Sequence, residues 1–174
     1  MAETNLKNYT VQEKLNKMDV DLIDVTVATD ADAAGEVLIL VTEIPNAVAV
    51  NGGTAILQSA MFMSNKVLTD AIDIVITSDS SALQKSGPAD LGIEDNVQAS
   101  ALVTTAAVMD GTCGFFSMTN LFDAGAVAIA SKNNIGMVCK AASDSTSLYV
   151  WAIAQGTTDW DVDTGVLRLG FIKD

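Results

Sequence analysis

Residues 47–63 read Ala47-Val48-Ala49-Val50, then Asn51-Gly52-Gly53, then Thr54-Ala55-Ile56-Leu57-Gln58-Ser59-Ala60-Met61-Phe62-Met63. A run of apolar residues stands on each side of a turn triplet. Glycine adopts positive φ freely and asparagine nearly so, which is typical of a hairpin turn. The pattern therefore predicts two antiparallel strands joined by this turn. In the second strand we expect Leu57, Met61 and Met63 on one face.

On both sides of this stretch, the sequence continues as short apolar runs separated by turn residues. Residues 36–42 form a continuous apolar run, which is typical of a strand buried on both faces. Two strands are expected around the polar quartet at residues 131–134, which fits a hairpin loop. Further strands are expected over residues 20–27, 72–77, 147–154 and 166–172. Nine or ten short strands separated by turns predict an all-β domain, either a β-sandwich or a jelly-roll-like barrel.

The first eighteen residues differ from the rest of the chain. They contain three of the nine basic residues, and Thr10-Val11-Gln12-Glu13 has the spacing of a capping box. We therefore divide the chain into an N-terminal arm or short helix at residues 1–18 and a β-sandwich domain at residues 19–174. One short helix is also expected over residues 94–102.

Charge restricts the class of partner. The chain carries 22 acidic and 9 basic residues, a net charge of −13, and has no Lys or Arg between Lys17 and Lys66. A nucleic-acid binder needs clustered cations to replace counterions on phosphates. We therefore expect neither nucleic acid nor a membrane as partner. The acidity favours solubility, or docking on a surface with basic patches.

The residues needed for common catalytic sites are missing. The chain has no His, which excludes Ser-His-Asp and Cys-His sites and His-ligated metals. Cys113 and Cys139 lie 26 positions apart without a C-x-x-C motif. A single disulfide between them is one reading, and two free, buried thiols in a reducing compartment are the favoured one. We expect a protein that is not an enzyme and has no cofactor.

One acidic motif resembles a cation site. Asp159, Asp161 and Asp163 alternate along the chain, and three carboxylates can converge on Ca²⁺. An EF-hand loop would need Gly at its sixth position and Glu at its twelfth, where this chain has Thr164 and Gly170. The EF-hand interpretation therefore fails. A solvated turn before the last strand explains the same residues.

The segment around residue 116 is the densest in aromatic residues. It contains the interface candidates Phe115, Phe116, Met118, Leu121 and Phe122 within a stretch that also holds Gly114. Exposed apolar patches mark protein interfaces, so this segment is predicted to contact a partner. The alternative is an apolar plug packed under a loop.

Three segments resemble a known family: residues 46–59, residues 134–143 running into 146–150, and residues 167–172. Together they are similar to the head decoration, or cement, proteins of tailed phages. The resemblance covers roughly residues 20–172 and consists of turn glycines and strand residues, with no catalytic motif. It implies a β-rich fold and the major capsid protein of a phage as partner. It also implies a homo-oligomer, with a trimer favoured and a dimer as the alternative, on the outer surface of the virion after synthesis in the host cytoplasm.

A second class of function stays open at this point. A β-sandwich adhesion or carbohydrate-binding module would have the same strand pattern. In such a module the carboxylates of the Asp-rich turn would bind Ca²⁺. Such a module should show melting that depends on Ca²⁺ or glycan. A cement protein should be insensitive to both and should raise the rupture temperature of phage heads.

Overall fold

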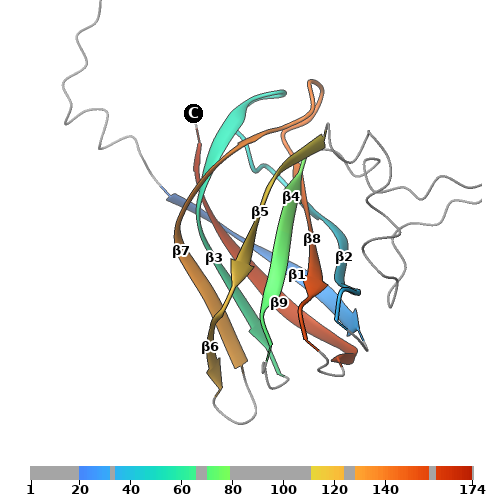
Figure 1. Ribbon diagram of the computed structural model, residues 1–174. Helices are drawn as coiled ribbons and strands as arrows, with labels where there is room; N and C mark the ends of the chain where they lie inside the picture. Colours follow the sequence, from blue (N-terminus) through green and yellow to red (C-terminus); the bar gives the residue numbers. More distant parts are fainter. Residues whose placement is uncertain are drawn as a thin grey trace, which may run out of the picture.

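The computed structural model describes residues 20–31, 34–65, 70–78, 111–123, 128–156 and 160–173, and the ribbon in Figure 1 follows its strands. The strands are β1 (Val20–Ala31), β2 (Val37–Ile44), β3 (Thr54–Ser64), β4 (Ile72–Thr77), β5 (Thr112–Met118), β6 (Asn120–Asp123), β7 (Ala128–Lys140), β8 (Leu148–Ala154) and β9 (Trp160–Lys173). The arm predicted at residues 1–18 and the helix predicted at residues 94–102 lie outside the described residues. No helix in the described part of the chain is long and apolar enough to cross a membrane.

The strands form one continuous antiparallel sheet that divides into two layers. Its order is β5-β4-β8-β2-β1-β9-β3-β7-β6. The junction between β2 and β1 is a single register pair, Thr29 with Ile39. On one side of this junction is a four-stranded layer, β5-β4-β8-β2. On the other is the layer β1-β9-β3-β7, with the short β6 added at its edge. The predicted β-sandwich is confirmed.

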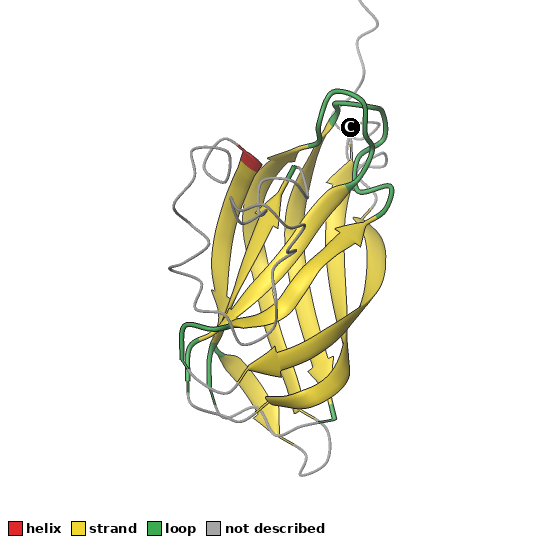
Figure 2. Ribbon diagram, turned by 90° about the vertical axis from the view of Figure 1, so that its right-hand side faces the viewer, coloured by secondary structure: helices red, strands yellow, loops and turns green. Residues whose placement is uncertain are grey.

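The strand order is that of a jelly roll. β1 pairs with β9, β2 with β8, β3 with β7, and β4 with β5. These pairs join the first strand with the last, the second with the last but one, and so on inward, as in a long antiparallel hairpin. In a jelly roll this hairpin is rolled up, so that the pairs β1–β9 and β3–β7 lie in one layer and β2–β8 and β4–β5 in the other. The connecting loops that are described gather at the two ends of the sandwich (Figure 2).

One run of chain passes from the first layer to the second. β5 pairs with β4, and after Thr119 the chain continues as β6, which pairs with the first residues of β7. A strand that changes sheets in this way forms a corner of the sandwich. It also places β5, the edge of one layer, beside β7 in the other.

The core lies between the layers and is built from inward-facing residues of both. Along β4, the alternation that the sequence predicted places Ile72, Ile74 and Ile76 inside with no exposed surface. They meet the large buried side chains of the other strands, among them Leu38, Ile39, Leu57, Phe62, Met118 and Phe171. Burying side chains of this size contributes roughly 1.5–3 kcal/mol each, which is the main stabilising term of the fold.

The predicted hairpin around Asn51-Gly52-Gly53 is wrong, although the turn itself exists. Gly52 has φ +67°, and the Gly53 N–H donates to the Val50 carbonyl at 2.8 Å. The preceding residues 47–50 are not a strand. Their backbone is held instead by the loop before β8, where the Val48 N–H donates to the Thr146 carbonyl at 3.1 Å. β3 pairs with β7 and β9, because those strands offer a full ladder and a buried face.

The predicted hairpin at residues 131–134 is also wrong. Residues 128–140 form one strand, β7, that pairs with β3 on both sides of the polar quartet. Between the pairs Leu57–Met137 and Ser59–Asn133, β7 has two more residues than β3. Asn134 and Gly136, at φ +57° and +66°, absorb the extra length. Residues 134–136 therefore form a bulge, residues 131–133 stay paired with β3, and the chain does not reverse.

A second bulge, in β3, changes which side chains face outward. Against β9, Gln58 is an extra residue between Leu57 and Ser59. An extra residue moves all following side chains to the opposite face. Leu57 is buried, whereas Met61 and Met63 are only half-buried on the outer face. The prediction that these three share one face is therefore wrong.

Candidate interaction surface

Strand alternation divides the predicted aromatic interface between two environments. Phe116 is 7% exposed and Met118 is fully buried in the core, whereas Phe115 and Phe122 are 70% and 64% exposed. Leu121 lies in β6, paired with Ala130. Neighbouring residues of a strand point to opposite faces, so the five candidates cannot form one surface. Of the four candidates whose side chains are described, Phe115 and Phe122 are the two that a partner could reach.

The predicted cation motif is only partly described. Asp161 and Asp163 belong to β9, where Asp163 pairs with Thr29 of β1, and Asp159 lies outside the described residues. Within the described residues, no group of three His, Cys, Asp or Glu side chains is placed to hold a metal ion.

A different apolar surface lies on the outer face of the β1-β9-β3-β7 layer. Four β-branched residues stand side by side on four adjacent strands: Val20 pairs with Ile172, Ile172 with Ile56, and Ile56 with Val138. Val20 and Val138 are 42% and 63% exposed. Their chain neighbours Leu57, Cys139 and Phe171 point into the core. We call these four residues the four-strand row.

Leu22 extends the row along β1. It pairs with Gly170, and a Cβ at Gly170 would lie 3.1 Å from Val20 Cγ1 and 3.4 Å from Leu22 Cδ2. The two side chains therefore both cover this glycine. Leu22 keeps 62% of its surface exposed. At the other end of the row, a hollow of about 250 Å³ opens between Ile56, Val138 and Ile172.

One ion pair borders this apolar surface. The Arg168 guanidinium donates to both carboxylate oxygens of Asp24, at 2.7 and 2.8 Å. This hydrogen bond lowers the pKa of the Asp24 carboxyl and raises that of Arg168. A second ion pair, between Lys173 and Asp21 at 2.7 Å, lies on the opposite face of the same strands, where Asp21 pairs with the buried Phe171. The exposed Asp24–Arg168 pair adds little stability. An apolar centre with a polar rim is the usual anatomy of a protein interface.

Sequence reasoning missed the four-strand row, although a signal was present. The tripeptide Ala55-Ile56-Leu57 and the dipeptide Phe171-Ile172 are apolar at consecutive positions. In a strand that is covered on one face only, such a run must expose part of its apolar surface. Detecting the row also requires knowing that β1, β9, β3 and β7 are neighbours. Local sequence patterns do not indicate which distant strands pair.

Fold and surface together define an antiparallel jelly-roll protein with an apolar outer face. No protein-family model matches the chain, and no curated protein matches its sequence.

Similar solved structures include one from Desmodium yellow mottle tymovirus, at 10% identity and TM-score 0.23, covering 89% of each chain. A capsid structure of Helicobacter pylori bacteriophage KHP30 has 10% identity and TM-score 0.26, covering 88% of this chain and 93% of that one. A full particle of Israeli acute paralysis virus has 4% identity and TM-score 0.28, covering 99% of this chain and 81% of that one. These superpositions are loose, so the jelly-roll assignment rests on strand order and register.

Proposed function

We propose that this chain is a structural virion protein that decorates the outer surface of an icosahedral phage capsid and bridges major capsid subunits. One observation carries the proposal. The strand portions of the three segments that resemble phage decoration proteins fall mainly on β3, β7 and β9, which are adjacent strands of one layer. The end of the second segment, residues 146–150, reaches β8 in the other layer. Each segment contributes one member of the four-strand row: Ile56, Val138 and Ile172. The resemblance and the exposed apolar surface thus overlap on these three strands.

The surface has the physical properties that such a role needs. Its residues lie on paired strands, so little backbone freedom is lost when they bind. Each copy offers a small apolar area, and the contact of one copy is therefore weak. Repetition over a symmetric shell adds such contacts through multivalency. The net charge of −13 favours a partner surface with basic patches.

We also propose that the chain acts as a homo-oligomer, with a trimer favoured by the resemblance and a dimer as the alternative. Light scattering coupled to gel filtration distinguishes the two by mass. A strict monomer at the concentrations used for binding would argue against this part of the proposal. Residues 1–18 are proposed to reach a neighbouring capsid subunit. Unchanged head binding after their deletion would refute that role.

The decisive experiment is saturation binding of the purified protein to empty icosahedral phage shells, measured by co-sedimentation. We expect a fixed number of copies per shell and a higher rupture temperature of the shell. Val138→Glu should weaken binding, because it places a charge in the apolar row. Val50→Glu is the matched control: Val50 is also 63% exposed but lies in the loop before β3.

Two outcomes would contradict the proposal. Binding that never saturates would mean adsorption without specific sites. Equal effects of the two Glu variants would mean that the four-strand row is not the docking surface. A melting temperature raised by Ca²⁺ or by a glycan, without shell binding, would favour the adhesion or carbohydrate-binding alternative.

A further inference from the structure

We propose that Cys113 and Cys139 form a thiol modification site that reacts with a low-molecular-weight disulfide, such as oxidised glutathione, and ends as an intramolecular disulfide joining the two layers. Both cysteines are free thiols in the structure. The pocket beside Cys113 adjoins one end of the four-strand row, because Val138 also lines it. The inference does not depend on the proposed function.

The fold brings the two cysteines together from opposite layers. Cys113 lies in β5 and Cys139 in β7, and among the described residues no backbone pairing joins these strands. The two strands nevertheless pack closely against each other. A Cβ at Gly114 would lie 3.0 Å from Met137 Cε. The Cys113 thiol donates to the carbonyl of Lys140, the residue after Cys139, with 3.8 Å between sulfur and oxygen. Cys113 therefore stands opposite Cys139 across the seam.

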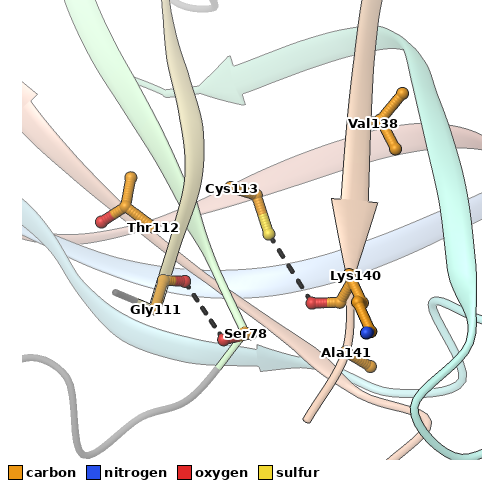
Figure 3. Close-up of a pocket in the computed structure, with 7 residues that line it drawn as sticks. All are labelled: Ser78, Gly111, Thr112, Cys113, Val138, Lys140 and Ala141. Atoms are coloured by element: carbon orange, nitrogen blue, oxygen red, sulfur yellow. Dashed lines mark hydrogen bonds between the residues drawn. The ribbon is translucent and has the colours of Figure 1, made fainter. Parts of the chain in front are cut away.

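Solvent reaches one of the two sulfurs. A pocket of about 340 Å³ opens along the seam, lined by Cys113 together with Ser78, Lys140 and Ala141. In Figure 3 the Cys113 side chain points across it toward Lys140. Cys139 is fully buried behind the pocket. A small disulfide can therefore meet Cys113 first, and Cys139 only through Cys113.

The electrostatics of the pair give the two thiols different roles. Hydrogen bonding between the two thiols lowers the pKa of Cys113 to about 7. The same hydrogen bond, together with burial, raises the pKa of Cys139. Lys140 is the one cationic side chain among the described residues that line the pocket. Cys113 is thus the thiolate near neutral pH, and the thiolate is the nucleophile in disulfide exchange.

The exchange proceeds in two balanced steps. The Cys113 thiolate attacks one sulfur of oxidised glutathione, forming a mixed disulfide and releasing one glutathione thiolate. Cys139 then loses its proton to solvent or to that thiolate and attacks the Cys113 sulfur, releasing the second glutathione. Two protein thiols are oxidised by two electrons, and one glutathione disulfide is reduced to two thiols.

The product would tie β5 to β7, two strands of different layers that no backbone pairing joins among the described residues. A cross-link that closes a loop of this length restricts the unfolded chain. For a protein of this size we expect the melting temperature to rise by roughly 6–12 °C on oxidation.

The test uses the full-length protein incubated with oxidised glutathione at pH 8, followed by intact mass and peptide mapping. We expect a product lighter by two hydrogens, with peptides containing Cys113 and Cys139 joined. Cys139→Ala should stop at the glutathione adduct on Cys113, and Cys113→Ala should leave Cys139 unmodified. The melting temperature of each reduced variant shows that it is folded.

Three results would overturn the proposal: thiols that stay unmodified in the folded wild-type protein, an adduct that forms first on Cys139, or disulfides only between chains. The absence of shell binding would leave this result unaffected, so the failures of the two proposals are distinguishable.

Discussion

Replacing Leu22 with Thr tests the docking surface at a position where the fold should tolerate the change. Leu22 lies on the outer face of β1 and is 62% exposed. Thr is polar and favours strands, so the backbone preference is preserved. We therefore expect the free energy of unfolding to change by less than about 0.5 kcal/mol, as for most surface substitutions.

The expected effect on binding follows from the surface that a partner would cover. Full burial of a Leu side chain contributes roughly 1.5–3 kcal/mol. Covering the 62% that is still exposed would contribute about 1–2 kcal/mol. Losing that contribution weakens each contact by about 5- to 30-fold.

The assay is a co-sedimentation isotherm on empty phage shells, with the protein present from well below to well above half-saturation. Phe115→Thr is the informative comparison, because Phe115 is 70% exposed but belongs to β5 in the other layer. We expect Leu22→Thr to weaken binding and Phe115→Thr to leave it within twofold. The opposite pattern would show that the four-strand row is not the docking surface and would favour the aromatic segment as the interface. Loss of binding together with a lowered melting temperature would indicate misfolding, and Val20→Thr would then repeat the test.

Three further predictions concern the fold and the thiols. Phe116→Ala should cost about 3–5 kcal/mol in chemical denaturation because Phe116 is 7% exposed, while Phe115→Ala next to it should cost under about 0.5 kcal/mol; equal costs would contradict the strand alternation. Gly165→Ala should cost about 1–3 kcal/mol, since its Cβ would lie 2.5 Å from Phe62 Cε2, and Phe62→Leu in the same chain should recover part of that loss, so a purely additive double variant would argue against this contact. Alkylation of Cys113 by iodoacetamide should rise with pH through a midpoint near 7, where its thiolate forms, and Cys139→Ala should move the midpoint upward by removing the hydrogen bond that lowers this pKa; an unmoved midpoint would show that Cys139 is not the cause.

The turn at Asn51-Gly52-Gly53 shows how far the local sequence reaches. The need for positive φ is a property of single residues, and Gly52 has φ +67° as the triplet requires. The partner of β3 is a different matter. β3 pairs with β9, more than a hundred positions away in the chain, and the energy of that pairing depends on which faces are buried together. A turn motif can therefore predict where a strand begins, but it does not predict which strand pairs with it.

The aromatic segment shows the same division at the level of single side chains. Its composition predicted an apolar cluster, and Phe115 and Phe116 are consecutive residues of β5. Period-two alternation requires that one face inward and the other outward. Only the packing of β5 over the core decides that Phe116 is the buried member.

The sequence by itself determined the all-β class, the turn at Asn51-Gly52-Gly53 and the lack of histidine chemistry, because each depends on residue type and short-range periodicity. The tertiary structure alone decided the four-strand row and the Cys113–Cys139 site. Both arise where strands that are distant in the chain become neighbours, through register on the outer face for the row and through the seam between layers for the cysteines. A bulge of one or two residues is enough to change which side chains meet there, since a shift by one residue turns every following side chain to the other face.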